Sequence, residues 1–487
     1  MPEFWYFCHL SFRLTFIFTV LLLIKRLFDS FSCHLLSDLY RERIMALSKK
    51  IQPLVVVLQL ICTVTAVHAL TLEECVQLAL KNNPDLQKQQ LSVELAHEDV
   101  AEQKSVNYGK LDIVGSYTHY NLPHTLAPLT PASIAFGAAD VPTTQDLFGT
   151  AVVYEVPLFT GFAQTRAVEA ADLQREMAGA TLKLSREQLI YNVRTLYVRI
   201  LSLQAQEKAE ASYVLSLQRL YDDVTRELAL GRKARIDQLK AAADLKNAMA
   251  SRDRIGGNVG ITKAALAALL DIDKIPELER IDLSSESMES IHEDFTDRFS
   301  GLQRLRAARL ATEKNSKLVE KSKAALYPQL LFNTSYGLNF GPNDSSNRYS
   351  GDWEDQEVWQ AGLYLKWNIF DFGGNRAKVG KARVLERRSR YEQLKTELEL
   401  KRALKEAVTK INIAVTDFKS AREELAMTRE TETIEQVRFE QGAADINDLL
   451  YAKARNQLAL SRFTEAGYTY RTAWFYLEYL LENGEKR

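Results

Sequence analysis

The chain has 487 residues, of which 46% are hydrophobic and 26% are charged, and its formal net charge at pH 7 is −1. A chain of this length can bury a large core, but its charge content excludes a polytopic helical membrane protein. The neutral balance, with no basic stripe interleaved with aromatic residues, also argues against nucleic acid as a partner.

The N-terminus is typical of an export signal that is preceded by additional residues. Two lysines follow Met45, residues 54–64 form an apolar stretch, and small residues just before Leu70 offer a cleavage site. We interpret residues 45–69 as a signal peptide, so that the mature chain begins at Leu70. Residues 1–44 are interpreted as an upstream extension from a misassigned start, for which a signal anchor is the alternative.

The remainder of the chain is a duplication. Gly231 and Gly442 are 211 residues apart, and two phenylalanines that precede the long helical segments have the same separation. Self-similarity at a fixed offset indicates repeated structural units. We therefore expect two units, residues 70–280 and 281–487, each with a helix, a pair of strands and a helical hairpin.

Strands are expected where apolar and polar residues alternate. Between Phe332 and Phe340, for example, apolar residues alternate with Asn333, Ser335 and Asn339. This pattern is typical of a barrel strand with one face toward lipid and the other toward an aqueous lumen. A half-buried sheet in an ordinary domain fits the alternation almost as well, but the export signal and the lack of covering helices favour lipid. The expected strands span about residues 110–121, 147–158, 329–340 and 359–369, and the acidic segment 352–357 is expected to be an extracellular loop.

The expected strands of one chain do not suffice for a barrel. Beyond the signal peptide no apolar run reaches the roughly 18 residues of a membrane helix, so strands would have to cross the membrane. Four strands would leave open edges whose backbone groups are unpaired in hydrocarbon. Three copies of the chain would supply a twelve-stranded barrel, which is wide enough for an aqueous lumen.

The segments between the strand pairs are expected to form unusually long helices. No proline occurs from Ala163 to Ile275, and aliphatic residues recur there at spacings of three and four. A helix over residues 163–228 would be on the order of 100 Å long. The hairpins are expected to turn at Gly231 and Gly442, because glycine reaches left-handed conformations without steric cost. A coiled-coil dimer is the alternative, but the junction with barrel strands favours a helical tube that continues the barrel.

Four short motifs occur in a fixed order along residues 70–482. They are Leu70-Thr71-Leu72-Glu73-Glu74, Leu158-Phe159-Thr160-Gly161-Phe162, Ile369-Phe370-Asp371-Phe372-Gly373-Gly374 and Arg438-Phe439-Glu440-Gln441-Gly442. In order and spacing they resemble the TolC-type outer-membrane efflux protein family. The resemblance implies a mainly α-helical homotrimer, with a twelve-stranded transmembrane β-barrel in the outer membrane and a twelve-helix α-barrel in the periplasm.

The resemblance further implies partners at the periplasmic end of the helices. These partners are a periplasmic adaptor protein and an inner-membrane transporter of the RND or ABC type. The adaptor is expected to dock at the hairpin tips, which are formed by Leu230, Gly231, Arg232, Gln441, Gly442 and Ala443.

Roles for individual residues near the tips also follow from the resemblance. The family narrows its pore with acidic rings; Asp448 matches the first ring position, and Tyr451 occupies the second. We expect Asp448 to form a three-fold carboxylate ring that favours cations, and Tyr451 to add a steric constriction. Asp237 matches the acidic member of the family's latch, but Phe439 and Ala444 replace the usual tyrosine and arginine partners. The alternative for both aspartates is capping of a helix N-terminus.

Together these features predict a passive exit duct for an efflux pump or a type I secretion system. A periplasmic adaptor protein and a structural coiled-coil scaffold are the alternatives, which the duplication and the alternating strands disfavour. No set of nucleophile, base and acid indicates an enzyme, and no cofactor is expected. No metal site is expected, because His119 and His124 have no carboxylate nearby in the sequence and all four cysteines lie near the N-terminus.

Overall fold

The computed structural model describes residues 69–135, 141–281, 290–291, 295, 301–345 and 351–484. The expected upstream extension and almost all of the expected signal peptide lie outside these residues. Two consecutive halves share the order of one helix, two strands, one long helix and one shorter helix, and the first half has two further short helices. The first half contains α3 (Leu72–Asn82), α4 (Pro84–Ser105), β1 (Lys110–Thr125), the short α5 (Pro131–Ala135), β2 (Thr143–Phe159), α6 (Ala163–Ala229) and α7 (Arg235–Leu270). The second half contains α8 (Gln303–Lys323), β3 (Gln329–Pro342), β4 (Trp353–Lys366), α9 (Gly374–Glu440) and α10 (Ile446–Leu480).

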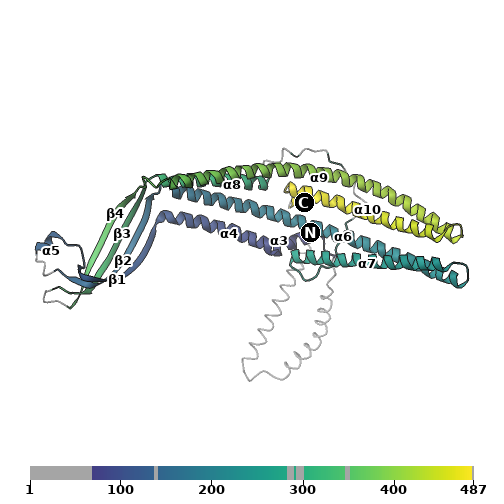
Figure 1. Ribbon diagram of the computed structural model, residues 1–487, viewed down its shortest axis with the longest axis horizontal. Helices are drawn as coiled ribbons and strands as arrows, with labels where there is room; N and C mark the ends of the chain where they lie inside the picture. The colour runs from purple at the N-terminus through teal and green to yellow at the C-terminus, as the bar shows by residue number, and fades with distance from the viewer. Residues whose placement is uncertain are drawn as a thin grey trace, which may run out of the picture. The chain divides into compact units, whose positions relative to one another are not determined.

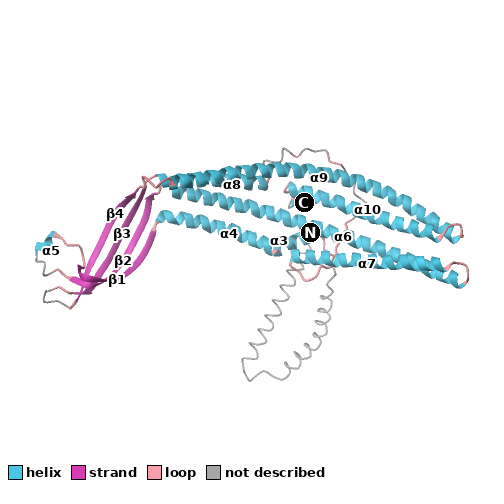
Figure 2. Ribbon diagram, in the orientation of Figure 1, coloured by secondary structure: helices cyan, strands magenta, loops and turns pink. Residues whose placement is uncertain are grey.

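The four strands form one antiparallel sheet in the order β1-β2-β3-β4, which lies at one end of the helices (Figure 2). The sheet joins the two halves of the chain, because β2 of the first half pairs with β3 of the second. Within the described residues, β1 and β4 each have a partner on one side only. Both edges of the sheet therefore carry unpaired backbone groups.

The structure corrects the expected bounds of β4. The acidic segment 352–357 is not a separate loop, because β4 begins at Trp353 and pairs with β3 along its whole length. Alternating hydrophobicity marks only the apolar part of a strand, so it could not indicate this polar extension. At the other end the last pair is Gln329 with Lys366, and the strand stops there instead of at residue 369. The next partner residue is Pro328, which has no N–H to continue the ladder.

Two helices of 67 residues each, α6 and α9, run from the sheet to the hairpin turns (Figure 1). At 1.5 Å per residue each is about 100 Å long. Shorter helices lie beside them. On the side of the sheet, neighbouring helices follow the order α4, α6, α8 and α9; on the side of the turns the order is α7, α6, α10 and α9. The chain therefore forms a curved wall with one long helix from each half.

The short helices of each half meet end to end near the middle of the wall, and polar side chains join them there. In the first half, Asn83 Nδ2 donates to the carbonyl oxygen of Leu269 at 3.1 Å. In the second half, a carboxylate oxygen of Glu482 accepts from the backbone N–H of Arg304 at 3.0 Å. Each long helix thus has an almost continuous partner made of two shorter ones.

The helices pack through several apolar clusters along the wall. One cluster near the middle includes Val193, Tyr197 and Leu270, and another nearer the turns includes Leu217 and Leu449. Among the described helices, none is both long and apolar enough to span a bilayer.

Candidate functional site: the sheet faces and the hairpin ends

The strand register gives the sheet one apolar and one polar face. Paired residues share a face, and successive residues of a strand alternate between faces. A row on the apolar face consists of Ile113, Val152, Tyr336 and Trp359. The neighbouring row on the opposite face consists of Asp112, Val153, Ser335 and Gln360. Ile113 is 83% exposed and Trp359 is 73% exposed, which in water would be an unusually large apolar patch. This polarity is typical of a strand wall with lipid on one side and water on the other.

Aromatic rings cross the apolar face at the end remote from the helices. The ring of Phe148 lies 4.9 Å from that of Tyr117 and 5.5 Å from that of Phe340, and Trp353 lies 6.1 Å from Phe340. One aromatic residue from each strand thus contributes to a row. Such a row is expected where a strand leaves the hydrocarbon for the interface.

A second group of aromatic rings lies where the strands give way to the long helices. Phe159 packs against Phe162 at 5.4 Å, and Phe370 packs against Phe372 at 4.8 Å. Eight residues separate Phe332 from Phe340, which corresponds to about 26 Å along the strand. The apolar face is therefore about as tall as the roughly 25 Å band of an outer-membrane barrel.

The two hairpin turns have the same backbone geometry. Gly231 has a φ of 72° and Gly442 a φ of 75°, which confirms the expected left-handed conformation. At the end of each helix, one backbone hydrogen bond spans five residues instead of the four of a regular α-helix. These bonds run from Arg232 N–H to the Glu227 carbonyl and from Ala443 N–H to the Arg438 carbonyl, both at 2.8 Å. Apart from the glycine itself and its two neighbours in the chain, no heavy atom lies within 4 Å of a Cβ added at either position, so the positive φ is the reason for glycine.

The two aspartates near the tips have different environments. Asp237, the third residue of α7, accepts the backbone N–H of Ala234 at 3.3 Å, as the capping alternative describes. In α10 the preceding Asp445 occupies the cap position, and a hydrogen bond from Asn447 lowers the pKa of its carboxyl group. Asp448 is exposed, and within the described residues its carboxylate has no hydrogen-bond partner. Asp448 is therefore free to face an aqueous space.

Asp448 and Tyr451 belong to an exposed stripe along α10. The members of the stripe recur at spacings of three and four residues and are Asp448, Tyr451, Arg455, Leu458, Arg462, Glu465 and Thr469. Arg455 Nη1 donates to the hydroxyl oxygen of Tyr451 at 3.0 Å, and the guanidinium lies 5.6 Å from the centre of its ring. The guanidinium of Arg455 thus fixes the Tyr451 side chain. Sequence reasoning missed Arg455, although the spacing of four residues from Tyr451 is a usable signal.

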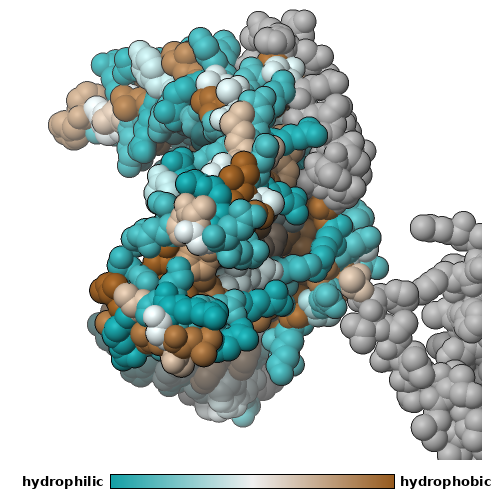
Figure 3. Space-filling model, turned by 90° about the vertical axis from the view of Figure 1, so that its right-hand side faces the viewer, coloured by the Kyte–Doolittle hydropathy of each residue, from teal (hydrophilic) through white to brown (hydrophobic). Residues whose placement is uncertain are grey.

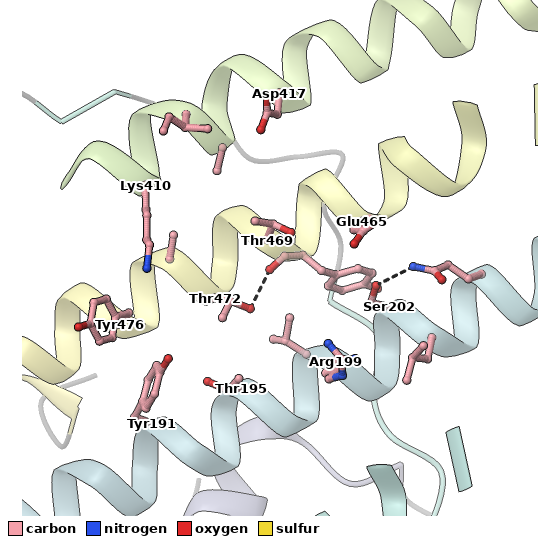
Figure 4. A pocket seen from close by; sticks show the side chains of 17 residues that line it. Tyr191, Thr195, Arg199, Ser202, Lys410, Asp417, Glu465, Thr469, Thr472 and Tyr476 are labelled. Carbon is pink, nitrogen blue, oxygen red and sulfur yellow. Dashed lines mark hydrogen bonds between the residues drawn. The ribbon is translucent and has the colours of Figure 1, made fainter. Parts of the chain in front are cut away.

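Farther along the same stripe, α6, α9 and α10 enclose a recess of about 750 Å³ (Figure 4). Glu465 and Thr469 belong to both the stripe and the recess lining. Tyr191 of α6 and Tyr476 of α10 point toward one another, with ring centres 5.8 Å apart. Lys410 of α9 lies 5.7 Å from the Tyr476 ring, and its hydrogen bond to a glutamate one turn away raises the pKa of its ammonium group. The recess and the exposed stripe therefore lie on one face of α10.

The tips of the two hairpins contact each other through an unforeseen pair. Lys233 Nζ, in the first turn, lies 4.3 Å from the centre of the Phe439 ring in the second hairpin. Ala444 is half-buried and adds no polar group. The six expected docking residues are all exposed, and the end-on surface is mainly hydrophilic with scattered apolar side chains (Figure 3). Within one chain, the tips are thus joined by a cation and an aromatic ring.

One histidine of the sheet has a carboxylate neighbour that the sequence did not indicate. Nδ1 of His119 lies 2.7 Å from a carboxylate oxygen of Asp146, because β1 pairs with β2 there. His124 instead contacts the carbonyl oxygen of Thr125 at 2.8 Å. Across the described part of the chain, no three metal-binding side chains gather at one point.

Comparison with known proteins agrees with this architecture. The family model described as outer membrane efflux protein matches residues 75–271 and 302–481. No curated protein matches the chain.

Among solved structures, the CmeC outer membrane channel of Campylobacter jejuni aligns with a TM-score of 0.72 at 16% identity, covering 85% of this chain and 86% of its own. The outer membrane protein VceC of Vibrio cholerae aligns with a TM-score of 0.70 at 15% identity, covering 84% and 96%. The open-state MtrE outer membrane channel of Neisseria gonorrhoeae aligns with a TM-score of 0.70 at 16% identity, covering 85% and 89%. At these identities the likeness shows the shared fold.

The family match covers both halves of the duplication and most of the chain. The chain therefore belongs to the outer membrane efflux protein family, the TolC-type family that its motifs resemble, and it is an outer-membrane protein.

Proposed function

We propose that three copies of the chain form the passive exit duct of an efflux pump or a type I secretion system. Each copy would contribute four strands to a twelve-stranded barrel and four helical segments to a twelve-helix periplasmic wall. A periplasmic adaptor protein and an inner-membrane transporter of the RND or ABC type would complete the path. The transporter would supply the energy, and this chain would supply the duct.

The observation that carries the proposal is the pair of open edges of the sheet. Within the described residues, β1 and β4 lack a partner on their outer sides, although the sheet has a strongly exposed apolar face. In hydrocarbon, unpaired backbone groups cost several kcal/mol each, so the sheet is stable in lipid only when both edges find partners. If β4 of one copy pairs with β1 of the next, the same rotation between copies gives the backbone groups of both edge strands their hydrogen-bond partners.

The exposed sides of the helices support the same arrangement. α9 is the outermost helix on one side of the wall. It carries two sets of large exposed apolar residues, and within each set the residues are seven apart. They are Val384, Tyr391, Leu398, Met427 and Ile434, in two sets. On the opposite side of the wall, Leu91 and Leu95 of α4 are 62% and 65% exposed. Packing α9 against α4 and α7 of the neighbouring copy would bury these side chains in helix seams.

The pore constriction is proposed at the exposed end of α10. With three-fold symmetry, Asp448 would form a ring of three carboxylates, and Tyr451 would form a ring of three phenols next to it. The contact from Arg455 holds each phenol in place. It also puts a positive charge seven residues beyond Asp448, farther from the hairpin turn. We therefore propose a constriction with a cation-attracting entrance and a positive ring behind it.

The roles of the tips are proposed as follows. Because Asp237 accepts a hydrogen bond from its own helix, Phe439 has no phenol and Ala444 has no guanidinium, the usual family latch has no counterpart in these residues. The exposed tip residues from Leu230 to Arg232 and from Gln441 to Ala443 are proposed to contact the adaptor.

Gel electrophoresis of the protein extracted from outer membranes tests the function. We expect an oligomer that is resistant to detergent at room temperature and converts to monomer on heating, and that forms ion-conducting channels in planar lipid bilayers. A photo-crosslinker at Gln441 is expected to capture an adaptor, whereas one at exposed Lys419 on α9 is not. A monomer that stays dispersed in aqueous buffer without detergent would contradict the proposal.

A further inference from the structure

The recess between α6, α9 and α10 has two chemically different ends. The end nearer the sheet is aromatic, because the ring of Tyr191 lies 5.8 Å from that of Tyr476 and 5.2 Å from that of Tyr479. The end nearer the hairpin turns is acidic, with Asp417 of α9 and Glu465 of α10 (Figure 4). Glu465 and Tyr476 are eleven residues apart on one helix, or about 16 Å. The recess of about 750 Å³ is therefore long enough for an extended small molecule.

The acidic end carries charge that no neighbour compensates. Within the described residues, the side chains of Asp417 and Glu465 have no ion-pair or hydrogen-bond partner. The ammonium group of Lys410 is neutralised, since its Nζ lies 2.8 Å from a carboxylate oxygen of Glu406. Arg199 of α6 is the other cation of the lining, and it also has no partner in the part of the chain that the structure describes. Two carboxylates and one guanidinium remain, so the uncompensated charge of the recess is negative.

Hydrogen-bond donors of α6 lie between the two ends. The hydroxyl oxygen of Thr195 is buried and has no hydrogen-bond partner among the described residues. A buried polar group of this kind costs free energy until a partner satisfies it. The guanidinium of Arg199 lies one helical turn farther along α6. Both groups can donate to an oxygen atom in the middle of a bound molecule.

We propose that the recess binds an extended amphipathic amine. Its aromatic group would lie against the tyrosines, where contact between rings is favourable. Its ammonium group would lie at the two carboxylates without partners, and an oxygen between the two groups would accept from the donors of α6. The ammonium group of Lys410 lies 5.7 Å from the Tyr476 ring, so it repels a second cation at the aromatic end. The lining therefore sets the direction of the molecule as well as its charge.

The position of the recess would place a bound molecule inside the duct. Glu465 and Thr469 belong to the exposed stripe of α10 that also carries Asp448. Glu465 is seventeen residues beyond Asp448, which corresponds to about 26 Å along the helix. With three-fold symmetry, three recesses would face the aqueous interior between the proposed constriction and the barrel. The inference rests on the proposed function only for this access, because every lining residue belongs to one chain.

Fluorescence titration of the purified protein in a non-ionic detergent, with two dansyl probes, tests this inference. Dansylcadaverine carries an aromatic ring, a sulfonyl group and, at the end of an alkyl chain, an ammonium group. Dansylaminohexanoate has the same ring, the same sulfonyl group and a chain of similar length, but it ends in a carboxylate. We expect saturable binding of the amine, with one molecule per chain and an affinity about ten-fold higher than that of the acid.

Substitutions that keep side-chain size separate the charges from the shape of the recess. Asp417→Asn combined with Glu465→Gln removes both charges, and we expect the affinity for the amine to fall about ten-fold. The matched control is Glu399→Gln, which removes an exposed carboxylate of α9 about 27 Å from Asp417 and should leave both affinities unchanged. Tyr476→Phe keeps the ring and should bind the amine like the unsubstituted protein. Tyr476→Leu removes the ring and should bind it several-fold more weakly.

The outcomes separate this inference from the proposed function. A protein that stays a monomer in detergent would contradict the duct, and its titration would still decide the recess. An oligomer that binds neither probe saturably, or binds the amine equally well without the two carboxylates, would overturn the recess alone. Equal affinity for both probes, or tighter binding of the acid, would overturn it too. If the double variant does not fold, the two substitutions of Tyr476 decide, and equal affinities for the amine would count against the site.

Discussion

Asp271 and Glu482 lie 211 residues apart and have the same left-handed backbone, each with a φ of 54°. Asp271 follows the end of α7, and Glu482 follows the end of α10, so the duplication extends to two strained non-glycine residues. Their side chains differ in function. The carboxylate of Glu482 accepts backbone N–H groups of Gln303 and Arg304 at the start of α8. Part of the strain at Glu482 is thus offset by a cap that joins α10 to α8.

We expect Glu482→Ala to lower the thermal unfolding midpoint of the protein in detergent. The change leaves two N–H groups at the start of α8 without their acceptor, which costs roughly 1–2 kcal/mol. Asp271→Ala is the matched control, because it keeps the same backbone strain without removing a comparable cap. Calorimetry of the two variants compares them directly, and equal midpoints would contradict the capping role of Glu482.

Alanine at Gly442 is expected to destabilise the second hairpin. A residue with a Cβ at a φ of 75° costs roughly 1–2 kcal/mol, even though the space around this glycine is open. Gly380→Ala inside α9 is the matched control; open space surrounds it too, but its backbone is helical, so alanine should stabilise by about 0.5–1 kcal/mol. Opposite signs for the two substitutions in thermal unfolding are the expected result. Equal signs would show that φ is not the cause.

The elements that could be predicted best from the sequence are those with a strongly periodic pattern of apolar residues. The heptads placed α6 at residues 163–228, and the structure has Ala163–Ala229. The turns at Gly231 and Gly442 could be predicted because few residues other than glycine adopt the left-handed conformation that ends a helix. The outer half of β4 could not be predicted, because Glu354 and Asp355 break the alternation, and only pairing with β3 shows that the strand continues.

Contacts between distant side chains were harder to predict than the elements themselves. Lys233 and Phe439, like Lys453 and Ser216, are separated by more than two hundred residues, and no local pattern relates them. The hydrogen bond of Asp237 could not be predicted from the residue type at position 234, because alanine has no capping side chain. The backbone N–H of Ala234 is the partner instead.

The two faces of β1 are expected to respond differently to a charge. Ile113 lies on the apolar face and Val114, its neighbour, on the opposite face. An arginine on the lipid side of a barrel costs about 2–4 kcal/mol near the midplane. Ile113→Arg should therefore reduce the amount of heat-modifiable oligomer in outer membranes, whereas Val114→Arg should leave it near the unsubstituted level. A reversed order would place the lipid on the other face.

Cys75 is expected to be inert in the folded protein. It is completely buried, and burial, with a smaller effect of Glu74, raises the pKa of its thiol to about 12. At pH 8 almost no thiolate is present, so a disulfide reagent should not react until denaturant is added. Lys419→Cys on the exposed surface of α9 supplies a reactive control thiol. Rapid labelling of Cys75 in the folded state would contradict the packing of α3 against α6.

Measurements of ion selectivity should distinguish the contributions of the two charged residues of the proposed constriction. Asp448 and Arg455 lie seven residues apart on the exposed stripe of α10, and they carry opposite charges on either side of Tyr451. Asp448→Ala removes the carboxylate ring, so the ratio of cation to anion permeability should fall several-fold, because fixed charges act strongly at close quarters in a pore.

Arg455→Gln should raise the same ratio, since it removes the opposing positive ring and leaves the carboxylates. Tyr451→Ala should increase conductance and change selectivity little, because a phenol adds bulk but no charge. Reversal potentials in a salt gradient measure all three variants. Unchanged selectivity in Asp448→Ala would show that the carboxylate does not line the narrowest part of the pore.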